Sequence, residues 1–205
     1  MIATRPRTSV MPAQDRRAAT VDAVIALAAN GNPAAITTAA IAAAMGVTQG
    51  ALFRHFPDKD AIWAAVMASV ATRLLARIDA AADAAPTPLA ALRAMFMAHV
   101  AFAIEHPGVP RLLFGELQRA ESTPAKRETQ RLLKVYGERL RRHLSAAKAA
   151  HEIATDLDDN AAVMTFIGSI QGLVMQSLLA GDLRHMRDAA PGVFDLLRNG
   201  FGARP

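Results

Sequence analysis

The stretch ITTAAIAAAMGVTQGALFRHFPDKDAIW, residues 36 to 63, determines how the N-terminal part of this chain folds. It predicts two short helices joined by a tight turn and followed at once by a third helix. Thr37 and Thr38 precede an apolar run, and a threonine oxygen at that place can accept a hydrogen bond from an unpaired backbone N–H. Gly46 ends the first helix, since glycine readily adopts the positive φ of a helix end.

The second short helix is predicted from Gln49 to about Phe53. Thr48 supplies its N-cap, and Asp58 caps the long helix that follows. Pro57 ends the stretch between them, because the residue before a proline avoids the helical region. Val47, in the turn, is expected to point back into the core. Two short helices across a turn that contains glycine indicate a helix-turn-helix.

The tip of the second helix is small and polar, which suits entry into the major groove of B-DNA. Gln49 is the best candidate for reading a base, because its amide can pair with adenine N6 and N7. Thr48 and Ala51 offer methyl groups to thymine, and Gly50 allows the backbone to approach the DNA. Arg54 can reach a guanine or a phosphate. The alternative for each is an ordinary role as a cap, a packing residue or an exposed side chain.

These residues resemble the DNA-binding region of the TetR family of transcriptional regulators. The shared pattern consists of an Ile-Ala pair, a Gly-Val pair with a hydroxyl residue and a glycine after it, a Leu-aromatic-x-His-Phe run, and a Lys-Asp pair. Its members are Ile41, Ala42, Gly46, Val47, Thr48, Gly50, Leu52, Phe53, His55, Phe56, Lys59 and Asp60. The resemblance implies an all-α fold, in which a three-helix DNA-binding domain precedes a helical bundle for ligand binding and dimerisation.

The resemblance also implies roles for particular residues. His55 and Lys59 stand where the family contacts phosphates, and Thr37 or Thr38 stands at a helix N-terminus suited to the same role. Phe53 departs from the family, which usually has a tyrosine there whose hydroxyl reaches a phosphate. Because phenylalanine has no hydroxyl to donate, we do not assign that role to Phe53.

Composition independently favours a globular, helical protein. The chain has 205 residues, of which 52% are hydrophobic and 20% charged, and alanine, a strong helix former, dominates the apolar residues. No stretch alternates as a strand does. The absence of cysteine excludes disulfides and thiolate metal sites, and with no sign of an oxidising compartment we expect a cytoplasmic protein.

The net charge of +5 suits a polyanionic partner such as double-stranded DNA. Its distribution does not follow the motif. Residues 1–62 carry six Lys or Arg against four Asp, a net charge of +2, whereas residues 124–149 carry eight against two Glu, a net charge of +6. We place the DNA site at the motif, since a few well-placed groups make phosphate contacts. The basic segment is interpreted as a solvated helix face.

Three regions are expected along the chain: a flexible basic arm at 1–14, the DNA-binding domain at 15–62 and the C-terminal domain at 63–205. Arg5 and Arg7 in the arm either belong to a loose terminus or follow the minor groove. A first helix at 15–29 covers the motif. The further helices are predicted at 58–85, 89–105, 110–120, 124–150, 158–180 and 192–199.

Residues 161–180 carry no charge, and a helix of that length could just span a bilayer. Polar residues inside the segment and acidic residues at both ends argue against a membrane. Gly168 and Gly172, four residues apart, allow a close backbone approach on one face. We expect this helix to pack with the 192–199 helix against the same pair of a second copy, which the resemblance also implies. Burial inside one subunit's own core is the alternative.

The C-terminal half contains methionine and aromatic residues that suit an adaptable ligand cavity. An ordinary core is the alternative. His99 is the polar residue in an otherwise apolar helix. The candidate ligand-binding residues are Phe96, His99, Phe102, Phe114, Met164 and Met175.

No motif of a catalytic site, a phosphate loop or a metal site occurs in the sequence, so we expect neither an enzyme nor a cofactor. The sequence therefore predicts a dimeric, ligand-responsive transcriptional regulator. A repressor that a small hydrophobic molecule releases from palindromic DNA is preferred to an activator of the same fold. The alternative from another class is a helical small-molecule carrier or interaction protein that does not bind DNA specifically.

Overall fold

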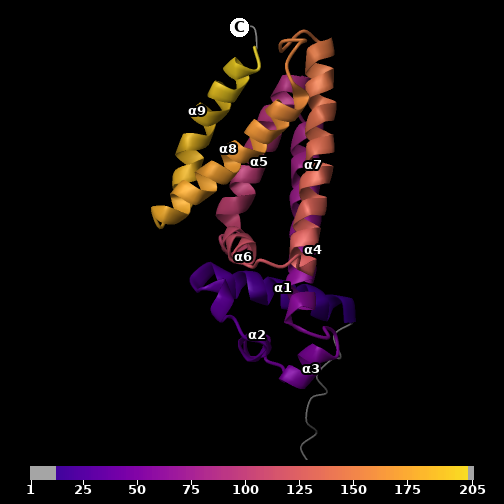
Figure 1. Cartoon of the computed structure of the whole chain (residues 1–205), viewed down its shortest axis with the longest axis vertical. Coiled ribbons are helices and arrows are strands. Elements are labelled where there is room, and N and C mark those ends of the chain that lie inside the picture. The colour runs from indigo at the N-terminus through magenta and orange to yellow at the C-terminus, as the bar shows by residue number, and fades with distance from the viewer. Residues whose placement is uncertain (1–12, 203–205) are drawn as a thin grey trace, which may run out of the picture.

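The computed structural model describes residues 13–202, and in that range it is built from α-helices with one short 3-10 helix and no strand (Figure 1). The predicted all-α fold is thereby confirmed. The N-terminal unit consists of α1 (Ala13–Asn30), η1 (Pro33–Ala35), α2 (Thr38–Ala44) and α3 (Gln49–Phe53). The C-terminal bundle consists of α4 (Lys59–Asp83), α5 (Pro88–Glu105), α6 (Gly108–Leu117), α7 (Pro124–Ala149), α8 (Asp159–Leu179) and α9 (His185–Gly200).

Local capping forms the N-terminal unit as the sequence predicts. Thr37 Oγ1 accepts a hydrogen bond from the Ala40 N–H at 3.1 Å, and Thr48 Oγ1 accepts one from the Ala51 N–H at 3.2 Å. Gly46, in the turn between the two helices, has a φ of 65°. These contacts satisfy backbone groups that the short helices leave unpaired.

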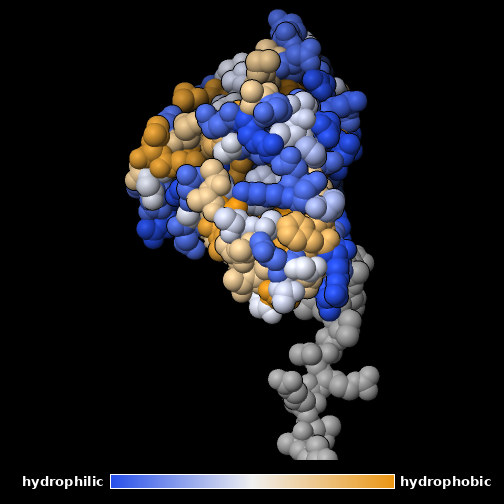
Figure 2. Space-filling view, turned by 60° about the horizontal axis from the view of Figure 1, so that its bottom comes forward, coloured by the Kyte–Doolittle hydropathy of each residue, from blue (hydrophilic) through white to orange (hydrophobic). Residues whose placement is uncertain are grey.

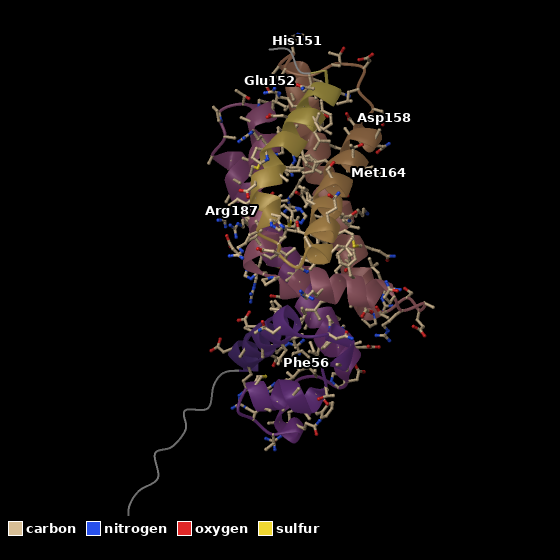
Figure 3. All side chains as sticks on the ribbon, turned by 90° about the vertical axis from the view of Figure 1, so that its left-hand side faces the viewer. Phe56, His151, Glu152, Asp158, Met164 and Arg187 are labelled. Carbon is tan, nitrogen blue, oxygen red and sulfur yellow. The ribbon has the colours of Figure 1, made fainter. Side chains whose placement is uncertain are left out.

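Helix α1 packs across the other helices of this unit and holds the end of α3. The Arg17 guanidinium lies 4.5 Å from the centre of the Phe56 ring and donates a hydrogen bond of 2.7 Å to the His55 carbonyl oxygen. Phe56 is fully buried among the N-terminal helices (Figure 3), beside Ile41 and Leu52 in the same core. This cover is needed because two short helices bury too little apolar surface to be stable alone.

In the bundle, α4 rises from the N-terminal unit beside α7, while α8 and α9 cover one side (Figure 1). Phe96 on α5 ties three helices together. Its ring lies 5.2 Å from that of Phe166 on α8 and 5.5 Å from that of Phe194 on α9. Such aromatic contacts add to the burial of apolar area, so they fix the position of α8 and α9 on the bundle.

Helix α6 lies between the bundle and α1 (Figure 1). Gly108, its first residue, approaches so closely that a Cβ there would lie 2.0 Å from the Ile25 carbonyl oxygen of α1. Just beyond the other end of α6, Arg119 forms an ion pair of 2.7 Å with Asp60, in the first turn of α4. The bundle therefore contacts the N-terminal unit through both α4 and α6.

Two details of the sequence-based expectation are wrong. Helix α9 begins at His185 rather than 192 and runs through Pro191, because Met186, Ala190 and Phe194 form one buried face that continues across the proline. Val47 does not point into the core, since 37% of its surface is exposed. The predicted basic arm cannot be compared, since residues 1–12 lie outside the described residues.

Three helices, α4, α5 and α8, are long and apolar enough to cross a membrane by length and composition alone. Each of them buries apolar residues at helical spacing against its neighbours in the bundle. In α4 these residues include Val66, Val70 and Leu74. Packing into a shared core therefore accounts for part of the hydropathy of these helices.

We predict that Gly108→Ala lowers the free energy of unfolding by roughly 1–3 kcal/mol, because α6 must move away from α1 to make room for the methyl group. Urea unfolding of the two proteins measures the difference. Gly115→Ala, on the same helix at a position where a Cβ would make only an ordinary contact of 3.5 Å with the Pro33 side chain, is the control and should be neutral or stabilising by up to ~1 kcal/mol. An equal loss of unfolding free energy in both variants would contradict the close contact of α6 with α1.

Candidate DNA-binding surface and ligand cavity

The residues predicted to contact DNA gather at the outer end of the N-terminal unit, which is turned toward the viewer in Figure 2. Gln49 Nε2 donates a hydrogen bond of 2.9 Å to Thr38 Oγ1, which ties α3 to the first turn of α2. The exposed members are Thr37, Thr48, Gln49, Gly50 and Arg54, and the partly exposed ones are Thr38, Ala51, His55 and Lys59. Eight of the nine belong to α2, α3 and the residues beside them, whereas Lys59, at the start of α4, also lines a hollow with Gly115 and Glu116 of α6.

Two cations at this end are placed to meet a polyanion. Arg54 is exposed, and the Lys59 ammonium lies 4.9 Å from the centre of the Trp63 ring. Neither forms an ion pair within residues 13–202. Asp60, by contrast, accepts a hydrogen bond from Arg119, and this contact lowers the pKa of its carboxyl. The neighbouring negative charge is therefore partly offset.

An apolar contribution to this surface was missed by sequence reasoning. Val47 and Phe53 are exposed on the same unit, at 37% and 43% of their surfaces. Exposed methyl and ring groups can contact the methyl group of thymine in the major groove. The only signal in the sequence was the replacement of the family's tyrosine by Phe53.

The C-terminal bundle contains an apolar cavity of about 100 Å³, which opens to solvent beside the exposed side chains of Leu133 and Gln171. Five helices line it, from α4 to α8. Met67, Val70 and Leu74 of α4 form one wall, and four residues of α6 form another, namely Val109, Pro110, Leu113 and Phe114. The polar residues of the lining are His99, Thr129, Tyr136 and Gln171. No Asp, Glu, Lys or Arg of the described chain takes part in it.

Three of the predicted ligand-binding residues, His99, Phe102 and Phe114, line this cavity. The others do not. Phe96 is fully buried in the aromatic contact with α8 and α9. Met164 (labelled in Figure 3) and Met175 lie to the side of the cavity lining on α8, where 76% and 43% of their surfaces are exposed. Because α8 is apolar on nearly every side, the sequence gives no indication of which face turns inward.

Within residues 13–202, two buried polar groups of the cavity wall have no hydrogen-bond partner: His99 Nδ1 and the Tyr136 hydroxyl. Their ring centres lie 5.5 Å apart. Burial lowers the pKa of His99 to about 4 and raises the pKa of Tyr136. Both side chains are therefore uncharged near neutral pH. Tyr136 and Gln171 were not predicted as ligand-binding residues, because each stands singly in a helix pattern.

The third feature is an exposed apolar face on α8 and α9. Met164, Leu179 and Leu196 expose 76%, 82% and 73% of their surfaces, and apolar surface gathers on the side of the molecule where these helices lie (Figures 1 and 2). Gly168 and Gly172 on α8 have open space where a Cβ would stand. A contiguous apolar face of this kind marks a site of protein association.

We predict that His99 makes the protein sensitive to acid. In the unfolded chain His99 takes up a proton near its ordinary pKa of 6.5, whereas in the folded protein it does so only near pH 4. Between these values the unfolded state binds more protons, so stability falls as the pH falls, by at most roughly 3 kcal/mol. Urea unfolding at a series of pH values should show a smaller fall for His99→Leu.

His185→Gln, at an exposed position on α9, is the matched control for this comparison and should keep the fall of the parent protein. A pH dependence in His99→Leu as steep as that of the parent would show that His99 is not held neutral by burial.

Comparison with known proteins addresses both parts of the chain. The family model described as bacterial regulatory proteins, tetR family, matches residues 21–66. The model described as tetracyclin repressor-like, C-terminal domain, matches residues 117–193. Nucleoid occlusion factor SlmA of Vibrio cholerae is 27% identical over 146 residues, which are 71% of this chain and 74% of that protein.

Solved structures share the fold at lower identity. The fatty acid degradation regulator FadR from Bacillus halodurans has a TM-score of 0.81 at 18% identity, covering 96% of this chain and 100% of that one. The transcriptional regulator FadR from Bacillus subtilis in complex with stearoyl-CoA has a TM-score of 0.79 at 19% identity, covering 89% and 98%. Since the family models match both the helix-turn-helix and the bundle, this chain belongs to the TetR family and is a DNA-binding transcriptional regulator.

Proposed function

We propose that this protein is a cytoplasmic transcriptional repressor, which binds palindromic operator DNA as a homodimer and is released by a small, mainly hydrophobic effector. The observation that carries the proposal is the position of α4. Its first turn buries Ile62 and Trp63, and its middle supplies Met67, Val70 and Leu74 to the cavity wall. A molecule in the cavity therefore touches the same rigid helix that enters the DNA-binding unit.

Helix α6 supplies a second connection between the two sites. Its residues Val109 and Leu113 line the cavity, while Gly108 lies directly against the backbone of α1. An effector that displaces α6 thus also changes the support of α1. Two elements with contacts at both sites are the physical requirement for coupling between them.

The size of the cavity supports release by an effector. Its volume of about 100 Å³ is below the roughly 300–1,000 Å³ of pockets that hold drug-sized ligands. A molecule much larger than this is fully buried only if the walls move apart, and these walls include α4 and α6. Such an effector binds the displaced state better and shifts the population toward it. The Bacillus subtilis FadR structure is a complex with stearoyl-CoA, so a protein of this fold can hold a small molecule.

The exposed face of α8 and α9 supports the homodimer. Two copies of this face, packed about a two-fold axis, bury Met164, Leu179 and Leu196 and bring α8 backbones together at Gly168 and Gly172. A dimer presents two recognition helices about one turn of DNA apart, roughly 34 Å, and so reads a palindrome. One helix-turn-helix alone would contact a single half-site.

We predict that Arg54→Ala together with Lys59→Ala weakens binding to the operator roughly tenfold or more, because phosphate contacts are lost. The dependence of log affinity on log salt concentration should also become shallower, by roughly 0.9 for each phosphate contact removed. Fluorescence anisotropy with an operator selected from a random duplex library, at several salt concentrations, measures both effects.

The matched control is Lys134→Ala together with Arg142→Ala, which removes two exposed positive charges from α7. This variant should keep the operator affinity, because α7 lies outside the helix-turn-helix. Equal weakening in both variants would indicate binding by net charge alone. No change in the first variant would support the helical carrier without specific DNA binding.

We predict that Met164→Glu together with Leu196→Glu yields a monomer, because two buried like charges would face their copies across the two-fold axis. Light scattering should show half the mass of the parent protein, and operator binding should fall accordingly. Leu117→Glu, at an exposed leucine of α6, is the control and should remain dimeric. Retention of the dimer in the double variant would exclude the α8 and α9 interface.

A further inference from the structure

We propose that the cavity recognises an uncharged, mainly apolar molecule through one hydroxyl or carbonyl oxygen, which pairs with His99 and Tyr136. This inference rests on the proposed function, since it names the chemical class of the effector. A carboxylate, a phosphate or a coenzyme A ester headgroup is excluded from the cavity, because the described lining residues offer no positive charge to pair with it.

The first argument is the pair of polar atoms without partners. His99 Nδ1 and the Tyr136 hydroxyl are both buried, and neither forms a hydrogen bond within the described residues. Buried polar groups are nearly always paired, so two unpaired groups in one wall indicate a partner that the protein alone does not supply. Their rings are neighbours, with centres 5.5 Å apart, so one bound molecule can reach both.

The second argument is the chemistry of these two groups. A phenol hydroxyl can donate and accept, and a neutral imidazole has one nitrogen that donates and one that accepts. A ligand hydroxyl can therefore accept from Tyr136 and donate to His99, or the reverse. A ligand carbonyl can accept from both. The rest of the lining is mainly aliphatic and aromatic, which suits a hydrocarbon body.

The third argument is the absence of compensating charge. The described residues that line the cavity include no Lys or Arg, and burial keeps His99 neutral above about pH 4 by lowering its pKa. An anion transferred from water into such a site loses its hydration and gains no counter-charge. Fatty acids and acyl-CoA headgroups therefore bind poorly inside it, even though the fold of FadR is similar.

The test compares four probes of similar hydrocarbon size with the full-length protein: cyclohexanone, cyclohexanol, methylcyclohexane and cyclohexanecarboxylate. Such rings are somewhat larger than the resting cavity, since an engineered apolar cavity of about 150 Å³ holds benzene, so their binding also requires the proposed movement of the walls. Calorimetric titration and the rise in melting temperature measure binding. We expect the ketone and the alcohol to bind and the carboxylate to show no binding at the same concentrations.

Tyr136→Phe is the decisive variant. It should weaken the binding of cyclohexanone roughly tenfold relative to the binding of methylcyclohexane, because the hydroxyl donor is lost while the aromatic ring remains. Without ligand, its melting temperature should be equal to or above that of the parent, since a buried hydroxyl without a partner is removed. His99→Leu should likewise reduce the preference of the protein for cyclohexanone over methylcyclohexane. Phe114→Leu is the matched control in the same wall and should change the affinities for both probes by one common factor.

The inference is overturned if the carboxylate binds as well as the ketone, if Tyr136→Phe leaves the preference unchanged, or if none of the probes binds. A lower melting temperature of unliganded Tyr136→Phe would also overturn it, by showing that a structural water satisfies the hydroxyl. Operator release, followed by anisotropy, separates this inference from the proposed function. Binding of the ketone without release contradicts the repressor mechanism alone, whereas release by a carboxylate alone contradicts the effector class alone.

Discussion

Helix α4 packs in two places at once, and the arrangement of the other helices follows from that. Its first turns bury Ile62 and Trp63 in the N-terminal unit, and Val70, Leu74 and Ile78 belong to the core of the bundle. A continuous helix of 25 residues is roughly 37 Å long and bends little without a proline or a bulge. In the proposed mechanism, a change of packing at the cavity is therefore transmitted along α4 to the N-terminal unit.

The close contact of Gly108 with the α1 backbone is a second connection between the bundle and the N-terminal unit. Helix α1 contacts both α4 and α6, and Arg119, just beyond α6, forms an ion pair with Asp60 at the start of α4. In the proposed mechanism, a shift of either helix turns the N-terminal unit, and α3, held to α1 through Arg17 and Phe56, turns with it.

The cavity combines two properties that rarely occur together in a core. Its walls are mainly apolar, yet His99 and Tyr136 bury polar atoms that find no partner in the described part of the chain, each at a cost of about 1–3 kcal/mol. Cores that serve only stability avoid such groups, because an apolar residue of the same shape would be better. The exposed apolar face of α8 and α9 is a comparable exception on the surface. Both exceptions lie where the proposed function needs a partner.

The sequence by itself determined the helix-turn-helix, its capping residues and the all-helical fold. Thr37, Thr48 and Asp58 cap the helices that were predicted to follow them, and Gly46 has the positive φ expected of it. Such signals are local, since a cap and its partner are at most a few residues apart. The family pattern is read from the same short stretch, so the class of regulator was also within reach.

Only the tertiary structure decided which side of each apolar helix faces the cavity, the core or the solvent. It placed Met164 and Met175 outside and Tyr136 and Gln171 in the cavity wall, exposed Val47, and extended α9 through Pro191. Successive residues of a helix point in directions about 100° apart, so an evenly apolar helix gives no preferred face. The choice is made by contacts with segments far away in the chain, which no local pattern contains.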